Sequence, residues 1–497
     1  ARASSMPLIT VTVALLSGAQ AHVRVDDSDT VAELKSRAEE GFGGKKLCRI
    51  LFGASVLSGD ALVGSAGLRD GDALSAVVAQ PLDVYATCNA FAAIKADGSV
   101  VAWGSELAGG RVQQELRGVQ RIVASDGAFA AIRGDGSVVA WGDERAGGDS
   151  DPVKKELAGG VDQIYPAGLA FAAVKADGCV VTWGEPTAGG DSSGVRQQLA
   201  GGVASICSAR RAFAALRADG SVVTWGDEDD GGDSAAVRAR LARGVSRVFS
   251  MGRAFAALKG DGSVVAWGGV SFGRDKAALL QELSSGVRHI YSTEDAFAAL
   301  KEVGSVVTWG DKYRGGDSGP VREQLQAGVE RIYATEGAFA AVKADGSVVT
   351  WGDPSDGGDC TPVRRLLAGG VKTIACTETA FAALKRDRSV VTWGSPFKGG
   401  NSTLVQKQLS NGVEHVYATR AAFAALKGDG SVVAWGSRGS GGDAKLVQQQ
   451  LQGDVHRLSC TGHAFAAVKG DGSVVTWGDP CCGGDSSAVR YQLAGFL

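Results

Sequence analysis

The chain is poor in features on which several large classes of protein depend. Its 497 residues include only 10 prolines and 2 methionines, and 51 basic residues against 54 acidic ones leave a net charge of −3. This balance gives no global electrostatic reason to expect a nucleic acid or an anionic membrane as partner. No apolar run reaches the length needed to cross a bilayer. We therefore expect protein partners, no nucleic acid and no membrane.

Patterns typical of catalysis are missing as well. The histidines form no recurring pair with Cys, Ser or a carboxylate, and no phosphate-binding glycine loop with its lysine occurs. The five histidines are His22, His289, His415, His456 and His463. We expect that the chain is not an enzyme, with no catalytic residues, no cofactor and no metal site.

Cysteine provides no framework for the fold. The nine cysteines are odd in number and scattered, and none recurs in most of the repeats described below. Free thiols in a reducing compartment explain them better than disulfides. The neighbouring Cys481 and Cys482 lack a matching second pair or a histidine cluster, so a zinc site is not expected. The interpretation implies an intracellular protein, cytoplasmic or nuclear.

What the sequence does contain is one hairpin written ten times, most often as AFAALKADGSVVTWGD. After a first gap of 38 residues, its tryptophans recur every 42 residues. They are Trp103, Trp141, Trp183, Trp225, Trp267, Trp309, Trp351, Trp393, Trp435 and Trp477. The same spacing separates ten phenylalanines, from Phe91 to Phe465. A fixed period of this size indicates units that bury their apolar faces only by stacking on one another.

Each unit is predicted to contain a short strand, the two hairpin arms, and a loop with a short helix. Both arms are apolar on both faces, which is typical of strands covered on two sides. The Asp-Gly turns, such as Asp97-Gly98, supply the positive φ that a tight hairpin needs. In one copy, Asp387-Arg388, the glycine is lost, so we expect Arg388 to be strained or its turn to be longer.

The first 80 residues stand apart, with no tryptophan and no repeat. Leu8 to Leu15 and His22 to Val25 are predicted strands, and Thr30 and Glu33 have the spacing of a helix capping box. Further strands are expected at Cys48 to Phe52 and Ala73 to Ala79. The alternative, a signal peptide at the start of this segment, fits the same residues less well.

This segment resembles ubiquitin-like domains through SDTVAELKSRAEE, CRILFGASVL and LRDGDALSAVVA. The resemblance implies an apolar patch for ubiquitin receptors that includes Leu51 and Val78. The alternative is a small fold that only caps the array. We therefore divide the chain into a disordered stretch at 1–5, a ubiquitin-like α+β (β-grasp) domain at 6–80 and ten repeats at 82–497.

The repeated AFAALK…DGSVVTWG hairpin resembles the regulator of chromosome condensation repeat and the repeats of propeller-type β-lactamase inhibitor proteins. This chain departs from the former family in two ways. The histidine that the family has before the apolar strand is absent in nine repeats, and the Gly-Gln-Leu-Gly ending of the family is replaced by GGDS and a helix. The resemblance implies a mainly β, propeller-like array of ten repeats. An open superhelical β solenoid is the alternative.

One basic residue ends the first hairpin arm in every unit, so stacking would place ten positive charges in a ring or ladder. These candidate partner-binding residues are Lys95, Arg133, Lys175, Arg217, Lys259, Lys301, Lys343, Lys385, Lys427 and Lys469. A solvated edge paired with the adjacent turn aspartates is the competing explanation. Aspartates also recur after Trp-Gly and after Gly-Gly, and two of them in one loop could contribute to a calcium site. Helix capping explains the set after Gly-Gly without any metal, so calcium is not expected.

These features together favour a non-enzymatic scaffold or adaptor for protein–protein interaction. The first domain would link it to the ubiquitin pathway by binding a ubiquitin receptor or a proteasome-type partner, while the partner of the repeats stays unknown. The resemblance to the chromosome condensation regulator implies an alternative, a guanine-nucleotide-exchange-type regulator of a small GTPase. A purely structural repeat protein is a third possibility.

Overall fold

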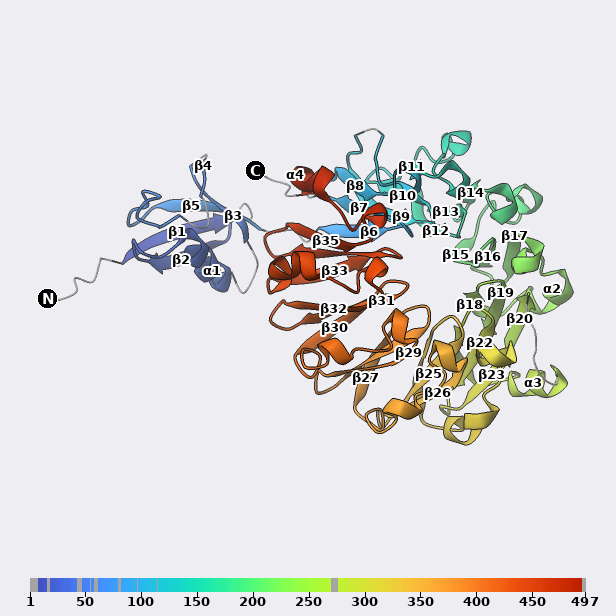
Figure 1. Ribbon diagram of the computed structural model, residues 1–497. Helices are drawn as coiled ribbons and strands as arrows, with labels where there is room; N and C mark the ends of the chain where they lie inside the picture. Colours follow the sequence, from blue (N-terminus) through green and yellow to red (C-terminus); the bar gives the residue numbers. More distant parts are fainter. Residues whose placement is uncertain are drawn as a thin grey trace.

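The computed structural model describes residues 8–15, 18–42, 47–53, 55–57, 61–78, 82–95, 97–113, 115–269 and 276–493. Within these ranges it leaves out the side chains of residues 48, 49, 56, 77 and 78. Two kinds of structure follow one another along the chain: a mixed α/β sheet, and then ten three-stranded sheets (Figure 1). None of the helices in the described residues is both long and apolar enough to cross a membrane.

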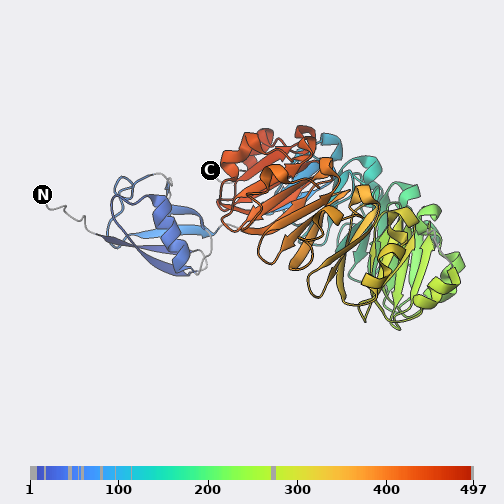
Figure 2. The ribbon, with the colours of Figure 1, turned by 60° about the horizontal axis from the view of Figure 1, so that its bottom comes forward.

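The first unit is a five-stranded sheet with one helix across a face (Figure 2). It contains β1 (Ile9–Leu15), β2 (Gln20–Val25), α1 (Val31–Gly41), β3 (Leu47–Phe52), β4 (Ser55–Val56) and β5 (Ala73–Val78). The strand order is β2-β1-β5-β3-β4, and only β1 and β5 run parallel. The predicted capping box is confirmed: Thr30 Oγ1 accepts from the Glu33 amide at 3.2 Å, and the Thr30 amide donates to Glu33 Oε2 at 2.7 Å.

Each repeat then forms one antiparallel sheet of three strands in sequence order. The first strands are β6 (Asp83–Ala86), β9 (Val119–Ala124), β12 (Val161–Pro166), β15 (Val203–Ser208), β18 (Val245–Met251), β21 (Val287–Ser292), β24 (Val329–Ala334), β27 (Val371–Cys376), β30 (Val413–Ala418) and β33 (Val455–Cys460). The middle strands are β7 (Ala90–Ile94), β10 (Ala128–Arg133), β13 (Ala170–Lys175), β16 (Ala212–Arg217), β19 (Ala254–Lys259), β22 (Ala296–Lys301), β25 (Ala338–Lys343), β28 (Ala380–Lys385), β31 (Ala422–Lys427) and β34 (Ala464–Lys469). The third strands are β8 (Val100–Gly104), β11 (Val138–Gly142), β14 (Val180–Gly184), β17 (Val222–Gly226), β20 (Val264–Gly268), β23 (Val306–Gly310), β26 (Val348–Gly352), β29 (Val390–Gly394), β32 (Val432–Gly436) and β35 (Val474–Gly478).

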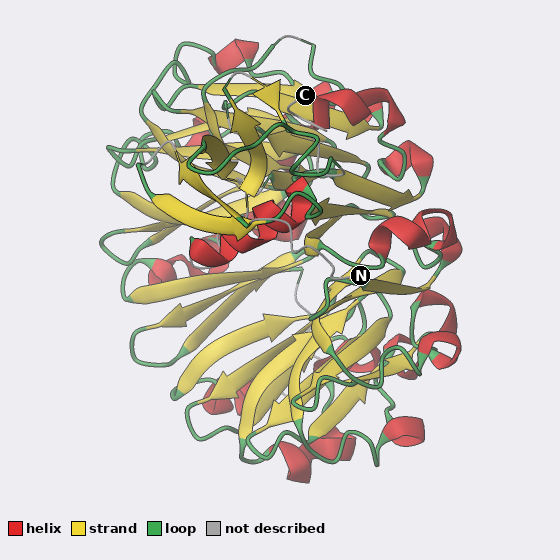
Figure 3. Cartoon of the chain, turned by 90° about the vertical axis from the view of Figure 1, so that its left-hand side faces the viewer, coloured by secondary structure: helices red, strands yellow, loops and turns green. Residues whose placement is uncertain are grey.

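Short helical turns, such as Pro354–Asp356 and Thr361–Val363, follow the third strands and lie on the outside of the sheets (Figure 3). Three of the connecting segments contain a short α-helix, α2 (Arg238–Leu241), α3 (Lys276–Glu282) or α4 (Arg490–Leu493). The predicted single helix near the end of the chain is therefore divided, since a 3-10 turn at Ser487–Val489 precedes α4.

The alanines and aromatic residues of the hairpin fill the spaces between repeats. In the repeat of Phe381, the side chains of Ala380, Phe381, Ala382 and Ala383 are all fully buried, and the Phe381 ring stacks on Trp393 at 5.1 Å. Trp393 Nε1 then donates to the carbonyl of Gly357 in the preceding repeat at 3.0 Å. Small residues let neighbouring sheets approach closely, and the indole joins one repeat to the next through both packing and a hydrogen bond.

The ten repeats close into a ring, so the alternative of an open superhelix is wrong. In repeat 10 the first strand, β33, packs against β6, the first strand of repeat 1 (Figure 1). The first strands of all other adjacent repeats pack against each other in the same way. Trp103 of repeat 1 donates to the carbonyl of Gly483 in repeat 10 at 3.2 Å, and the Gly462 amide donates to the Cys88 carbonyl at 3.0 Å. The joint between the two ends of the array thus uses the same contacts as an internal joint.

Turn chemistry follows the prediction. The glycines of the nine intact turns have φ between 75° and 83°. In the remaining turn, that of repeat 8, Arg388 adopts φ 65°. Its amide still donates to the Lys385 carbonyl and its carbonyl still accepts from the Val413 amide, both at 3.0 Å. The turn keeps its length, and Arg388 is held in a conformation that residues with a Cβ rarely adopt.

Candidate binding surface of the axial channel

The predicted basic residues end the middle strands, and all ten are half-buried. Four of the lysines have a local role because their ammonium groups donate to a backbone carbonyl 19 residues earlier. For example, Lys175 Nζ donates to Glu156 at 3.0 Å and Lys385 Nζ to Leu366 at 3.0 Å; Lys301 and Lys343 do the same. These contacts hold the end of the preceding helical turn, and a role in partner binding stays a prediction.

The two apolar residues expected on the first unit lie on neighbouring strands. Leu51 on β3 is half-exposed and pairs with Ser75 of β5. Val78 pairs with Leu47 across the same two strands, but its side chain lies outside the described residues. Their contact with a partner is also still a prediction.

The recurrent aspartates act on the backbone. After Trp-Gly, Asp353 Oδ1 accepts from the Ser355 amide at 2.8 Å, and after Gly-Gly, Asp359 Oδ1 accepts from the Thr361 amide at 2.8 Å. In the part of the chain that the structure describes, no group of three or more His, Cys, Asp or Glu side chains is placed to hold a metal ion. Asp353 is the N-cap of its helical turn, whereas Asp359 lies one residue before the N-cap of the next turn and forms a local side-chain-to-backbone turn instead.

The first strands form the innermost layer of the ring, because each contacts the first strands of both neighbouring repeats while the helical turns lie outside. One position on these strands carries five of the seven tyrosines of the protein, all half-buried. They are Tyr85, Tyr165, Tyr291, Tyr333 and Tyr417. Their rings pack on the next repeat, as Tyr165 does on the apolar cluster that contains Ile206. Burial raises the pKa of Tyr165 above its ordinary value.

Two residues before each tyrosine position, the same strands carry a second set of side chains that is rich in arginine. Its ten members are Asp83, Arg121, Gln163, Ser205, Arg247, His289, Arg331, Thr373, His415 and Arg457. We call Arg121, Arg247, Arg331 and Arg457 the axial arginines; all four are exposed. Arg457 contacts Asp83 at 3.0 Å across the joint between repeats 10 and 1.

The aromatic neighbours of one axial arginine restrict its movement. The Arg247 guanidinium lies 5.5 Å from the centre of the Phe249 ring, and Phe249 meets His289 edge-on at 4.9 Å. Burial, and then the positive charge of Arg247, hold the pKa of His289 below its ordinary value. We call the space that the ten first strands enclose, to which the axial arginines are exposed, the channel. One side of it contains a histidine whose pKa is lowered, beside a guanidinium that lies over an aromatic face.

Beyond the other end of the first strands, a loop in each repeat joins the first strand to the middle strand. At nine of the ten joints, an amide at one position of the loop donates to the carbonyl of the same position in the next repeat, as Glu336 does to Glu378 at 2.8 Å. We call these ten positions the loop ring: Cys88, Asp126, Gly168, Arg210, Gly252, Glu294, Glu336, Glu378, Arg420 and Gly462. Their backbone is nearly uniform, whereas their side chains differ in size and charge.

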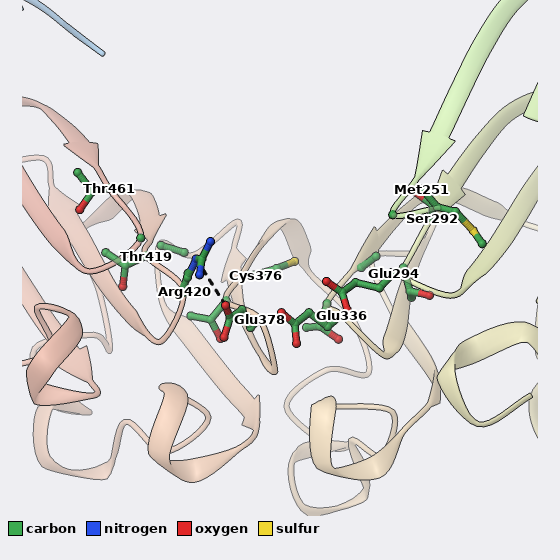
Figure 4. Close-up of a pocket in the computed structure, with 16 residues that line it drawn as sticks. Met251, Ser292, Glu294, Glu336, Cys376, Glu378, Thr419, Arg420 and Thr461 are labelled. Carbon is green, nitrogen blue, oxygen red and sulfur yellow. Dashed lines mark ion pairs between the residues drawn. The ribbon is translucent and has the colours of Figure 1, made fainter. Parts of the chain in front are cut away.

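Three successive loop-ring residues make one arc acidic: Glu294, Glu336 and Glu378 line a basin of about 520 Å³ (Figure 4). Glu378 is paired with Lys398 at 2.7 Å and with Arg420 at 3.6 Å. Burial raises the pKa of Glu336, and the negative charges of Glu378 and Glu294 raise it further. The arc therefore keeps a partly uncompensated negative charge at the edge of a hollow.

The neighbouring arc of the same surface is rich in arginine. A cavity of about 540 Å³ is lined by Arg210, Arg211 and Arg253 together with aspartates of the adjoining turn. Arg211 pairs with Asp227 at 2.9 Å, and Arg253 pairs with the nearly buried Asp230 at 2.8 Å. Because four aspartates, Asp126, Asp227, Asp229 and Asp230, line the same cavity, its charge is mixed, whereas the neighbouring basin is lined by three glutamates.

Comparisons with known proteins extend to structures only. No protein-family model matches the chain, and no curated protein matches it. Solved structures that it resembles include the ectodomain of the receptor kinase CR4 of Physcomitrella patens, with 15% identity, a TM-score of 0.30 and coverage of 56% of this chain and 74% of that chain. Prp20p of Saccharomyces cerevisiae has 17% identity and a TM-score of 0.32, with coverage of 56% of this chain and 82% of that chain. The computationally designed protein Ika8 has 13% identity and a TM-score of 0.29, with coverage of 64% of this chain and 96% of that chain. Nothing about the partners of this chain follows from these matches.

The sequence contains a signal for the channel that the predictions above do not use. The tyrosines of the first strands stand six residues before the repeated phenylalanines, as Tyr165 does before Phe171. The arginines stand eight residues before them, as Arg331 does before Phe339. These positions vary between repeats, so they do not stand out beside the invariant residues of the hairpin.

Proposed function

We propose that the chain is a non-enzymatic scaffold that binds protein partners through the loop ring. The observation that carries this proposal is the contrast between a backbone that repeats and side chains that do not. If the loops served only to close the ring, one residue such as the Gly168, Gly252 or Gly462 of three repeats would suffice throughout. Instead, seven positions carry larger side chains, and charged ones are grouped in arcs beside hollows, which suits recognition of a partner of defined shape.

The test compares two sets of charge-neutralising substitutions in the full chain. One variant carries Arg210→Gln, Glu294→Gln and Glu336→Gln in the loop ring. The control carries Lys155→Gln, Glu156→Gln and Glu323→Gln, at exposed positions of the second helical segment of their repeats, with the same change of charge. Partners captured from cell extract are identified by cross-linking and mass spectrometry, and melting temperatures no lower than that of the parent chain establish folding.

We expect the control to retain the partners of the parent chain and the loop-ring variant to lose them. Cross-links should also start from lysines near the loop ring, such as Lys398. An identical set of partners for all three proteins, or cross-links confined to the second helical turn of each repeat, such as Thr403–Val405, would exclude the loop ring as the binding surface.

The first unit adds a proposed link to the ubiquitin pathway. What supports it is the arrangement of the unit, with a parallel central pair β1 and β5, flanking antiparallel strands and a capped helix across one face, together with a half-exposed Leu51. Binding of purified ubiquitin receptors to the full chain tests this link. Leu51→Ser should weaken binding, and Leu62→Ser, at an exposed leucine outside the sheet, serves as the control. Equal binding by both variants would contradict it.

A further inference from the structure

Four exposed arginines share one position on the inner wall of the ring. The axial arginines belong to repeats 2, 5, 7 and 10, so that three, two, three and two repeats separate each from the next around the closed ring. Because every first strand contacts its neighbours, the strands hold these side chains at one level of the channel. The charge is therefore distributed around the axis and not gathered on one side.

Most of this charge has no counterpart in the protein. Arg457 is paired with Asp83, whereas Arg121, Arg247 and Arg331 take part in no ion pair among the described residues. Asp83 is also the only acidic residue among the ten members of this position. A guanidinium presents a planar fork of donors that matches a carboxylate or phosphate in two parallel hydrogen bonds. An anionic ligand on the axis would meet such forks from several directions.

We propose that the axial arginines hold an acidic segment of a polypeptide partner in the channel. The proposal rests on the scaffold function above and names the chemistry of the segment that reaches inside. Carboxylates along an extended chain can meet arginines of different repeats in turn, because each side chain is long and exposed. The contact of Arg247 with the Phe249 ring restricts that guanidinium before binding, which reduces the entropy that binding costs.

The other features of the channel favour a polypeptide over a nucleic acid strand. A strand passing along the axis would carry its phosphates from the arginines to the loop ring, about five residues or roughly 16 Å further along the chain. There it would meet the acidic arc of Glu294, Glu336 and Glu378, with the same sign of charge. The tyrosines also offer poor stacking platforms, because their rings pack on the next repeat. A polypeptide can change its charge along its length, and a nucleic acid cannot.

The experiment measures fluorescence anisotropy of three labelled probes of equal length: a glutamate-rich peptide, a lysine-rich peptide and oligothymidine. The full chain is titrated against each probe at several salt concentrations. The test variant carries Arg121→Gln, Arg247→Gln and Arg331→Gln. The control carries Arg196→Gln, Arg238→Gln and Arg364→Gln, which remove the same charge from equivalent, exposed positions of the outer turns.

We expect the parent chain and the control to bind the glutamate-rich peptide, and the axial variant to bind it at least about tenfold more weakly, with a smaller dependence on salt. Equal affinity of the two variants would overturn the proposal. Oligothymidine that binds the parent chain more tightly than the acidic peptide, and loses affinity in the axial variant, would overturn it in favour of a nucleic acid.

The outcome is separable from that of the scaffold test. If loop-ring substitutions abolish partner capture while the axial variant binds the glutamate-rich peptide normally, the scaffold stands and the acidic segment is wrong. If the acidic peptide binds as expected but no captured partner depends on the loop ring, the acidic segment stands and binding through the loop ring is wrong.

Discussion

Replacing Arg388 with glycine should stabilise the protein, although it removes a charged side chain and an ion pair. Arg388 occupies the position that glycine fills in the other nine hairpin turns, and its φ of 65° lies in the left-handed region. That conformation costs a residue with a Cβ roughly 1–2 kcal/mol. Glycine relieves this strain but gives the unfolded chain more freedom, which takes back about 0.4–1 kcal/mol.

The ion pair hardly changes this balance. Arg388 and Glu414 are 3.5 Å apart, with 62% and 44% of their side chains exposed, and exposed pairs of this kind contribute about 0–1 kcal/mol. We therefore expect Arg388→Gly to raise the free energy of unfolding by about 0.5 kcal/mol. Hydrogen exchange of the Val413 amide, which donates to the residue 388 carbonyl, should slow as the turn becomes less strained.

The reverse substitution, Gly346→Ala, provides the matched control. Gly346 has φ 76°, and a Cβ there would lie 2.7 Å from the Gly370 amide nitrogen, so the alanine must both adopt the strained conformation and displace backbone. It should cost about 1–3 kcal/mol. Denaturant unfolding, with exchange at single amides to detect local opening, measures both variants. A loss of stability for Arg388→Gly comparable to that of Gly346→Ala would refute the argument from strain.

Three further predictions concern the joints, the mouth of the channel and the turns. Trp393→Phe should destabilise by about 2–4 kcal/mol, because it leaves the buried Gly357 carbonyl without its donor and opens space beside Phe381; a change below 0.5 kcal/mol in denaturant unfolding, roughly the effect of a surface substitution, would contradict it. Glu336→Gln should raise the melting temperature at neutral pH, since a carboxyl whose pKa is raised on folding opposes folding where it is ionised, and the gain should vanish as pH falls below that pKa. The pKa of Asp345 is lowered mainly by hydrogen bonds from Ser347, so its stabilising effect is present above its unfolded pKa and lost as pH falls through the folded one; Asp345→Asn should therefore reduce the dependence of stability on pH in acid unfolding curves.

The invariant positions allowed most of the fold to be predicted. Trp393, Phe381 and the Asp-Gly turns have nearly the same environment in most repeats, so their chemistry can be deduced from a single copy. Closure of the ring is different, because it depends on how sharply each sheet is turned from the next. No single residue encodes that angle, and the joint that reveals it pairs Trp103 with Gly483, at opposite ends of the array.

The axial arginines could not be predicted from the sequence for a related reason. Arg121 and Arg331 look unremarkable in sequence because each stands between a polar residue and an isoleucine in an ordinary strand pattern. Only closure brings four such arginines to one level around an axis. The basic residues that did recur, such as Lys175 and Lys385, turn out to hold backbone carbonyls. Regular recurrence thus indicated packing and support, whereas the residues that face the axis vary.

The joint between repeats 5 and 6 shows how a local departure from the repeat shapes the surface. Most repeats place Thr or Ser just before the loop-ring residue, where its hydroxyl accepts from a middle-strand amide, as Thr335 does from Ala338 at 3.1 Å. Repeat 5 has Met251 there, and the strand instead continues to pair Met251 with Ala254. Within the described residues, this joint is the one whose loop-ring amide, that of Gly252, donates no hydrogen bond to the next repeat. Met251 and Gly252 form one edge of the acidic basin, so the hollow begins where the loop ring is interrupted. A substitution that alters packing therefore also alters the shape of the surface that we propose for binding.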